Sequence, residues 1–230
     1  MKVLIGCEYS GTVRDAFISR GHDAMSCDLL PTDKPGPHFQ GDVFEAIKMK
    51  DWDLAIFHPP CTYLAGSGIH WNKRVPGREE LTKESVEFVK ALWECGIPRV
   101  CIENPIGVLS TRFRKPTQII QPWQFGDPES KATCLWIRGM QPLEPTKFAD
   151  FTHYRCKCGN VFEESFGKYG CCEKAASPLW NNQTASGQNK LGPSPDRWKI
   201  RSTTYQGIAD GMAAQWGGAG NAGETQLKLF

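Results

Sequence analysis

The sequence lacks the long apolar run that a membrane span requires. It contains no stretch of about 18 consecutive apolar residues, so no transmembrane helix is predicted. A secretory leader is not predicted either, because MKVLIGCEYSG has one lysine and only a short apolar stretch before its polar residues. The formal net charge is only +2 and the pI is about 8.0, which is compatible with a nucleic-acid partner but does not argue for one. We therefore expect a cytoplasmic protein.

Cysteine, by contrast, is frequent, with ten residues. Without an export signal, we expect these side chains to be thiols or metal ligands rather than disulfides. A chain of 230 residues and 25.7 kDa is long enough to bury a proper core. Because the sequence also has no internal repeat, one domain with an insertion is the natural expectation.

Short apolar segments alternate with helical patterns along the first part of the chain. Strands are predicted at Lys2–Ile5, Ala24–Cys27, Leu54–Phe57, Val100–Ile102 and Cys134–Ile137. Helices are predicted at Thr12–Arg20, after Val43 and, most clearly, at Glu79–Cys95. This alternation predicts an α/β fold: a Rossmann-like, mainly parallel sheet with helices on both faces and right-handed crossovers.

Changes in composition divide the chain into four parts. Residues 1–149 form the predicted core. Residues 150–195 hold four cysteines, several glycines and many polar residues, which is typical of a small cysteine-rich insertion with little core of its own. Residues 196–217 regain helical character in GIADGMAAQW and would complete the core. Residues 218–230 have the glycine-rich composition of a flexible linker and end in QLKLF.

Reactive or polar residues stand at the ends of four predicted strands: Glu8 to Gly11, Asp28, Pro59 to Cys61, and Glu103 to Pro105. In open α/β sheets, ligands bind beyond these carboxyl ends. Asp28 is well placed to accept hydrogen bonds from ribose hydroxyls, and Gly6 and Gly11 would let the backbone approach a cofactor closely. Turn glycines and surface acids are the alternative for any single residue, and the four groups together disfavour it.

Cys61 is the most distinctive of these residues. Its thiol follows a buried strand and is held by the stiff pair Pro59 and Pro60, so it is positioned rather than packed. A thiolate is a nucleophile whose pKa depends on its surroundings. The alternative is a small buried hydrophobe, which is how most free cysteines behave. We apply that second interpretation to Cys7, Cys27, Cys95, Cys101 and Cys134.

Four segments carry a resemblance to a known family: GCEYSGTVRDAF, DLAIFHPPCTYLAGSG, IENPIGVLS and YQGIADGMAAQW. In this order they resemble the S-adenosylmethionine-dependent DNA cytosine C5-methyltransferases, and in particular a compact, phage-type branch. The resemblance covers roughly Met1–Gly139 and Thr203–Gly217, and its most specific part is PPC followed by ENP, each after a strand. It implies a catalytic core at residues 1–149, DNA as partner, and the host cytoplasm as location if a phage encodes the chain.

The resemblance also implies the chemistry. Cys61 would attack C6 of a flipped-out cytosine, and C5 would then take the methyl group of S-adenosylmethionine. Glu103 would hold N3 and the exocyclic amine of the base, and its pKa should be raised if it donates a proton. The cofactor would lie against Glu8, Tyr9, Ser10, Gly11, Asp28, Asp42, Pro59, Tyr205 and Gln206. Among these, Asp42 would take the adenine amine and Asp28 the ribose.

Two departures from the family pattern concern the handling of base and phosphate. In FGDPESKATCLWIRG the family usually has PQ followed by two spaced arginines, whereas this chain keeps Pro128 but has Glu129, Lys131 and Thr133. Lys131 would serve where an arginine normally contacts the base or the phosphate, although a lysine cannot reproduce the arginine fork. His58, before the prolines, replaces a usual glycine.

The insertion suggests a metal site and a reduced target recognition segment. Four thiolates, Cys156, Cys158, Cys171 and Cys172, can hold a structural Zn²⁺, and His153 could replace one of them. The CxC and CC spacings differ from the usual CxxC, so free thiols or a disulfide-capable surface loop are the alternatives. Basic residues in and after the insertion could follow phosphates, or could simply be solvated: Lys157, Lys168, Lys174, Lys190, Arg197, Lys199 and Arg201.

The last five residues, QLKLF, resemble the peptide by which many bacterial and phage proteins bind the replicative sliding clamp. Gln226 would hydrogen-bond in one pocket, and Leu227, Leu229 and Phe230 would supply the apolar contacts. Clamp binding would raise the effective concentration of the protein at replicating DNA. A frayed tail, or a tail packed on its own domain, is the alternative.

Three functions follow from the sequence. The first is a DNA (cytosine-5)-methyltransferase, serving restriction-modification or the marking of phage DNA. The second is a C5-methyltransferase of a free cytosine nucleotide such as dCMP, which the short recognition segment and mild charge favour. The third is a non-catalytic DNA- or clamp-binding protein on the same scaffold, which the intact Cys61 and Glu103 disfavour.

Overall fold

A seven-stranded sheet forms the centre of the protein, as a computed structural model shows for residues 1–151, 153–163, 176–184, 186 and 189–218. The strand order is β3-β2-β1-β4-β5-β7-β6. The strands are β1 (Lys2–Gly6), β2 (Asp23–Asp28), β3 (His38–Gln40), β4 (Leu54–Phe57), β5 (Arg99–Pro105), β6 (Gln118–Ile120) and β7 (Thr133–Arg138). β1 to β5 pair in parallel, and β7 is antiparallel to both β5 and β6. The predicted Rossmann-like, mainly parallel sheet is confirmed.

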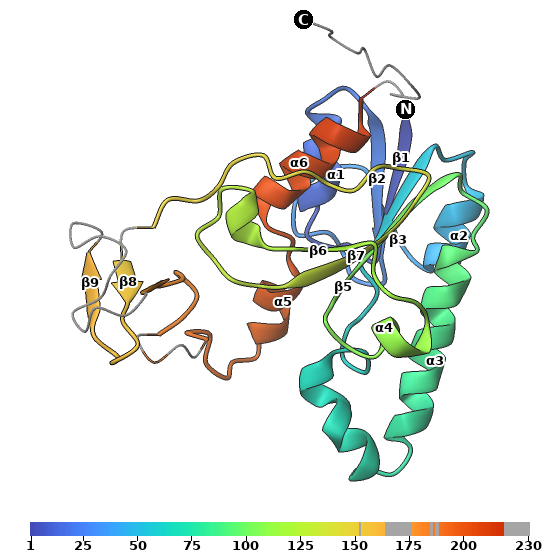
Figure 1. Ribbon diagram of the computed structural model, residues 1–230. Coiled ribbons are helices and arrows are strands. Elements are labelled where there is room, and N and C mark those ends of the chain that lie inside the picture. The colour runs from blue at the N-terminus through green and yellow to red at the C-terminus, as the bar shows by residue number, and fades with distance from the viewer. Residues whose placement is uncertain (152, 164–175, 185, 187–188, 219–230) are drawn as a thin grey trace, which may run out of the picture.

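Helices cover both faces of this sheet (Figure 1). They are α1 (Thr12–Ile18), α2 (Val43–Lys48), α3 (Arg78–Trp93), α4 (Leu109–Arg112), α5 (Arg197–Ser202) and α6 (Gln206–Trp216), with 3-10 turns η1 (Gly66–Lys73) and η2 (Pro122–Gln124). α1 and α6 pack together on one face, and α2 and α3 lie on the other. None of the helices within the described ranges is long and apolar enough to cross a membrane.

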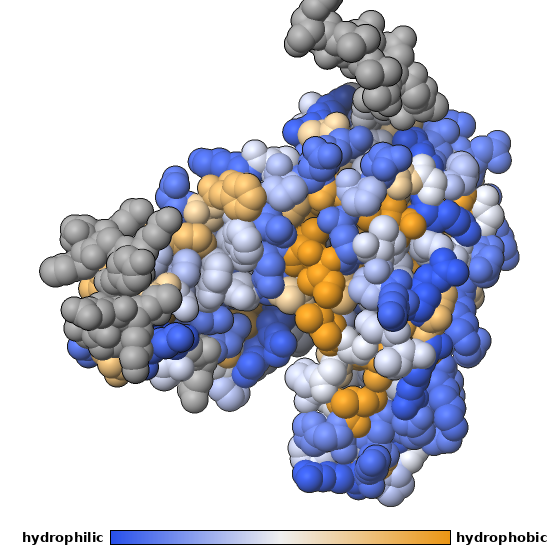
Figure 2. Space-filling model, in the orientation of Figure 1, coloured by the Kyte–Doolittle hydropathy of each residue, from blue (hydrophilic) through white to orange (hydrophobic). Residues whose placement is uncertain are grey.

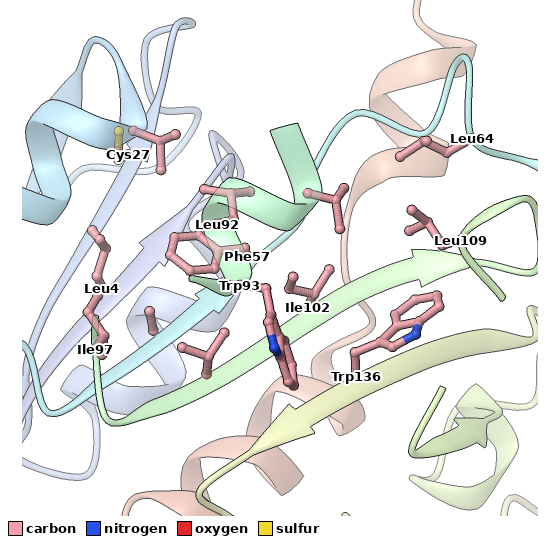
Figure 3. Close-up of a cluster of buried hydrophobic side chains, with 14 of the residues drawn as sticks. Leu4, Cys27, Phe57, Leu64, Leu92, Trp93, Ile97, Ile102, Leu109 and Trp136 are labelled. Atoms are coloured by element: carbon pink, nitrogen blue, oxygen red, sulfur yellow. The ribbon is translucent and has the colours of Figure 1, made fainter. Parts of the chain in front are cut away.

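The alternation of side chains along the strands explains the two faces. In β1, Val3 and Ile5 join the core beneath α1 and α6, whereas Leu4 joins the core beneath α2 and α3. β4 has no polar residue, and all four of its side chains are fully buried, as expected for a central parallel strand covered on both sides. Figure 3 shows the second core, in which Leu4 and Phe57 lie with side chains of α3 and β5.

A buried arginine holds the proline-rich loop in place and explains a strand that the sequence did not predict. Arg14 of α1 is fully buried. It donates to Ser26 Oγ and Thr32 Oγ1 at 3.1 and 3.2 Å, and to the carbonyl oxygens of Lys34 and Pro35 at 3.1 and 3.3 Å. These bonds bring the loop beside β2, where His38–Gln40 adds β3 to the sheet.

Part of the predicted insertion forms a small separate sheet in the order β10-β8-β9, with β8 (His153–Arg155), β9 (Val161–Glu163) and β10 (Ser177–Pro178). In Figure 1 it stands away from the main sheet. Cys156 and Cys158 follow β8, but Cys171 and Cys172 lie outside the described residues, as does the tail with Gln226, Leu227, Leu229 and Phe230. The part of the chain that is described holds no group of three His, Cys, Asp or Glu side chains suited to a metal. The zinc site, the domain limits and clamp binding stay predictions.

Candidate active site

The carboxyl ends of β1, β2, β4 and β5 meet at one edge of the sheet, because these strands are parallel. The segments that carry Cys61, Glu103 and Asp28, and the loop from Glu8 to Gly11, all lie at this edge. The direction in which successive strands are added also reverses between β1 and β4. β2 and β3 are added on one side of β1, and β4 and β5 are added on its other side. Such a switch point is where open α/β sheets bind their ligands.

Backbone and side-chain hydrogen bonds join the loop after β4 to the loop after β5. Asn104 is buried, and its Nδ2 donates to the carbonyl oxygen of Pro59 at 2.8 Å. Further along, the N–H of Gly66 donates to Ile106 O and the N–H of Val108 donates to Leu64 O, both at 2.9 Å. PPC and ENP are therefore two halves of one structure, which gives a physical reason for their occurrence together.

The tightest point of this junction is Gly107. A Cβ atom there would lie 1.9 Å from the carbonyl oxygen of Leu64, which is backbone and cannot move aside without shifting the loop. We expect Gly107→Ala to lower the free energy of unfolding by about 1–3 kcal/mol or more, the usual scale of overpacking. The measurement is urea unfolding of the wild type and the variant.

Gly192→Ala is the matched control, because a Cβ at Gly192 meets no atom within 4 Å. It should unfold within about 0.5 kcal/mol of the wild type, as ordinary surface substitutions do. Equal stability of the two variants would show that the two loops do not approach each other as described.

Cys61 stands in the turn directly after β4 and is exposed. Its pKa is raised, first because the surrounding protein desolvates the thiol and second because the Glu103 carboxylate lies nearby. Lys131 and Arg201 act in the opposite direction and stabilise the thiolate. The structure thus brings the predicted catalytic residues Cys61, Glu103 and Lys131 within electrostatic range of one another.

Arg201 joins this group from α5, although the sequence suggested only phosphate binding for it. Its carbonyl oxygen accepts a hydrogen bond of 2.8 Å from Lys131 Nζ, so α5 is fixed beside the site. Lys131 Nζ also lies 5.6 Å from the centre of the Tyr205 ring. The contact spans 70 residues of sequence. Only the fold could bring it about, and the basic composition of α5 was its one signal.

Glu103, in β5, has a side chain that is 15% exposed. Burial raises the pKa of its carboxyl group, but His58, Lys131 and Thr133 together outweigh burial, so that the net shift is downward. His58 Nδ1 lies 3.5 Å from Glu103 Oε2. This net direction is opposite to the raised pKa that the resemblance implied. The reason is His58, which stands where the family has a glycine.

A cavity of about 370 Å³ opens beside this group. The loop ends of β1, β2 and β4 form one wall and α3 forms another. Its lining residues are Cys7, Cys27, Asp28, Leu29, Gly41, Asp42, Val43, Pro60, Glu84, Ser85 and Phe88. Its volume falls in the range of small-molecule sites, and its mostly apolar wall with a few carboxylates is typical of them.

Two of the predicted cofactor residues, Asp28 and Asp42, face this cavity together. Asp28 accepts a hydrogen bond of 2.9 Å from the N–H of Leu30, and burial raises the pKa of its carboxyl group. Asp42 caps α2 by accepting a hydrogen bond of 2.7 Å from the N–H of Phe44. Each carboxylate is thus held in place by backbone before any ligand binds.

The predicted cofactor residues of the first loop have other partners. Glu8 is buried and accepts hydrogen bonds from the N–H groups of Val13 and Arg14 at 2.7 and 3.3 Å, so it satisfies the start of α1. Ser10 Oγ donates to Glu8 Oε1 at 3.1 Å, and Gly11 has a left-handed backbone with φ 70°. Tyr9 donates its hydroxyl to the carbonyl of Lys199. These residues shape the loop and do not line the cavity.

Three other predicted cofactor residues are also absent from the cavity wall. Pro59 is held by Asn104, behind the wall residue Pro60. The Tyr205 hydroxyl donates to the carboxylate of Glu129, and Gln206 donates to Asp210 at the start of α6. The structure places Tyr205 beside Lys131 instead. Their roles toward a cofactor stay predictions.

Sequence reasoning missed several residues that line the cavity. Cys7, interpreted as a small buried hydrophobe, has a left-handed backbone with φ 58° and forms part of the wall with Cys27. Burial and the carboxylates of Asp28 and Asp42 raise the pKa of both thiols, that of Cys27 to about 12, so the thiolate is disfavoured at both. Three further lining residues come from α3: Glu84, Ser85 and Phe88. The sequence pattern of α3 indicated which face packs on the core, but it did not indicate that other residues of the helix border a cavity.

The chain matches no family model and no curated protein. Among solved structures, it is similar to the crystal structure of a proposed DNA modification methyltransferase encoded within a prophage (E. coli). The sequences are 15% identical, the match covers 66% of this chain and 52% of that one, and the TM-score is 0.42. The chain thus spans about half the length of that protein.

Proposed function

We propose that the protein is an S-adenosylmethionine-dependent DNA (cytosine-5)-methyltransferase. The observation that carries this proposal is the junction of Cys61 and Glu103 at the ends of adjacent parallel strands, fixed by the Asn104–Pro59 hydrogen bond. A nucleophile and a carboxyl group are held there as one unit beside a cavity with three further carboxylates, those of Asp28, Asp42 and Glu84. The resemblance of PPC and ENP to this family supplies the specific chemistry.

The reacting groups have defined roles in this proposal. The Cys61 thiolate forms a bond to C6 of cytosine while the ring nitrogen N3 takes a proton through Glu103, which makes C5 nucleophilic. S-adenosylmethionine, when bound, supplies the methyl group that C5 accepts. A base then takes the C5 proton, N3 gives its proton back to Glu103, the bond between sulfur and C6 breaks, and the thiolate returns. Lys131 and Arg201 stabilise the thiolate in both the first and the last state.

The cavity fits the nucleoside part of this cofactor. Asp28 and Asp42 are acceptors for ribose hydroxyls and an adenine amine, and Phe88 gives an apolar wall. Pro60 borders the cavity one residue before Cys61, so a ligand bound there lies next to the nucleophile. Carboxylates from two different strand ends converging on one cavity favour a nucleoside over an anionic ligand such as a free phosphate.

Surface aromatic and basic residues support DNA as the substrate. In η1, Trp71 is 46% exposed and the Arg74 guanidinium lies 5.7 Å from its ring centre. In α5, Trp198 is 50% exposed beside Lys199. Figure 2 shows a notch between the lower lobe of the molecule, which holds η1 in Figure 1, and the rest of the protein. Exposed rings for base stacking, each with a cation beside it for phosphates, suit a nucleic-acid strand.

The test uses purified protein and S-adenosylmethionine with a labelled methyl group, offered cytosine-containing DNA and dCMP in parallel. We expect label in DNA, on C5 of cytosine. Label in dCMP alone would transfer the function to a free nucleotide. Bound cofactor with no label in either substrate would favour the non-catalytic binding protein.

Cofactor affinity provides a separate prediction. We expect Asp28→Asn to weaken S-adenosylmethionine binding about tenfold or more, since a hydrogen bond to a charged group contributes roughly 1.5–3 kcal/mol. Because burial raises the pKa of Asp28, wild-type affinity should decline on acidification earlier than for an ordinary aspartate, and this decline should be absent in Asp28→Asn. Calorimetric titration at several pH values measures both effects.

Asp51→Asn is the control for this experiment. Asp51 is exposed and precedes β4, at the opposite edge of the sheet from the cavity. It should bind the cofactor as the wild type does. Unchanged affinity in Asp28→Asn would mean that the cavity does not hold the ribose.

A further inference from the structure

His58 is a buried imidazole whose ring nitrogens have no hydrogen-bond partner in the described part of the protein. Its side chain is 8% exposed, and both Nδ1 and Nε2 are inaccessible to solvent. Its polar contact is with Glu103, where Nδ1 and Oε2 lie 3.5 Å apart, within ion-pair range but longer than a good hydrogen bond. Burying a polar ring without full pairing is costly, so its presence needs an explanation.

The register of the sheet places His58 beside Glu103. Phe57 of β4 pairs with Ile102 of β5, so the next residue of each strand falls at the same level. The N–H of His58 still donates to the carbonyl oxygen of Gly6, so the ladder continues to this point. The two side chains therefore emerge on the same face of the sheet, on rigid elements, at the edge where Cys61 follows.

The charged and titratable groups around His58 and Glu103 decide whether these two residues can exchange a proton with a substrate. The thiols near Glu103 all have raised pKa values, with burial as the first cause: Cys61, Cys101 and Cys134. Cys7, which follows β1, also has a raised pKa. The cations are Lys131, which acts on both Glu103 and Cys61, and Arg201, which acts on Cys61. Since the pKa of Glu103 is lowered, its carboxyl group holds no proton near neutral pH to give to a substrate.

We propose that His58 is a positioning residue that stores the proton which Glu103 passes to the target ring. The imidazolium proton on Nδ1 moves to Glu103 Oε2, and the carboxyl proton moves to N3 of cytosine as the bond between Cys61 sulfur and C6 forms. His58 is then neutral. When that bond breaks, N3 returns the proton through Glu103 to His58, and only the C5 proton leaves to solvent. This inference rests on the proposed function and names the proton source within the same site.

The first test follows covalent adduct formation against pH, using S-adenosylmethionine and DNA that contains 5-fluorocytosine. Once C5 has taken the methyl group, fluorine cannot leave C5 as a cation, so the adduct persists and can be counted on a denaturing gel. The rate of adduct formation should rise with pH as the Cys61 thiolate forms. It should level off at the pH where His58 and Glu103 lose the proton that they share. In His58→Asn, which keeps an amide donor but cannot hold the proton, levelling should begin at a lower pH, because the carboxyl group of Glu103 alone then carries the proton.

At pH 8 the variant should therefore form adduct about 10- to 100-fold more slowly than the wild type. A merely structural role for His58 predicts a uniform loss of rate with an unchanged pH profile, which would overturn the proposal. Thermal unfolding of His58→Asn, with and without cofactor, shows separately whether the variant is folded.

The second test needs no substrate. The protein has five histidines, and comparison of ¹⁵N spectra with those of His58→Asn assigns the imidazole of His58. We expect the ¹⁵N chemical shifts of the His58 imidazole to change in Glu103→Gln, because the carboxylate that lies 3.5 Å from Nδ1 is then lost. Unchanged chemical shifts would overturn the pairing. Changed chemical shifts, together with a wild type that forms no adduct at any pH, would instead refute the methyltransferase proposal, and the proton relay with it.

Discussion

Cys61→Ala is expected to form no covalent adduct with DNA containing 5-fluorocytosine and to lose methyl transfer by on the order of 10⁴-fold or more, the scale on which loss of a catalytic nucleophile acts. The reason is that, among the described residues, no thiol that lines the cavity has the exposure and the neighbouring cations of Cys61. Cys7 and Cys27 border the cavity, but they are less exposed than Cys61, and burial and the two cavity aspartates raise their pKa values. Lys131 and Arg201, in contrast, stabilise the Cys61 thiolate. Cofactor binding should be nearly unchanged, because Cys61 does not line the cavity.

Cys95→Ala is the matched control for thiol removal. Cys95 follows α3 and precedes the amino end of β5, so it lies at the opposite edge of the sheet from Cys61. It should keep full activity and full adduct yield. Methyl transfer that survives in Cys61→Ala would show that the chemistry proceeds without covalent attack and would remove the central residue of the proposal.

The pH dependence of the wild type follows from the same site. Burial and the Glu103 carboxylate both raise the pKa of Cys61, so only a small fraction of the free protein carries the thiolate at neutral pH. Because the thiolate attacks, alkylation of Cys61 should speed up as pH rises. Lys131 and Arg201 stabilise the thiolate, so a bound DNA phosphate that neutralises them would shift this dependence further upward.

Much of the sheet could be predicted from the sequence, because its strands are buried on both faces and read as short apolar runs. Leu54–Phe57 was predicted with the observed bounds, and the predicted helix Glu79–Cys95 is α3 with its ends moved by one and two residues. β3 was missed because its three residues pair only once Arg14 has drawn the proline-rich loop against β2. Such a strand depends on long-range contacts and leaves no local pattern.

Only those residues of the candidate site that follow the ends of parallel strands could be predicted from the sequence. The positions of Cys61 and Glu103 follow from parallel strands that share one edge. The approach of Arg201 to Cys61 does not, since it joins segments far apart in the chain. The pairing of His58 with Glu103 was hidden for a different reason: two single residues become neighbours only when the β4–β5 register is known. With that register, the departure from the family glycine becomes a candidate source of protons.

Glu103→Gln is expected to have the second large effect. It should slow attack on cytosine but speed up the alkylation of Cys61. A glutamine at this position still offers an oxygen to the exocyclic amine of cytosine, but it cannot pass a proton to N3. We expect adduct formation to slow by about 10²- to 10⁴-fold, the usual contribution of general acid catalysis. DNA affinity should change far less than the rate, because the shape and the hydrogen-bond acceptor remain.

The same substitution should make the thiol more reactive. The Glu103 carboxylate raises the pKa of Cys61, so its removal lowers that pKa and increases the thiolate fraction at any pH below it. Alkylation of Cys61 by iodoacetamide should therefore be faster in Glu103→Gln, although attack on cytosine is slower. Glu87→Gln, on the exposed side of α3, should change neither rate. A variant that slowed both reactions would be a damaged site. Opposite changes are expected only if Glu103 activates the ring rather than the thiol.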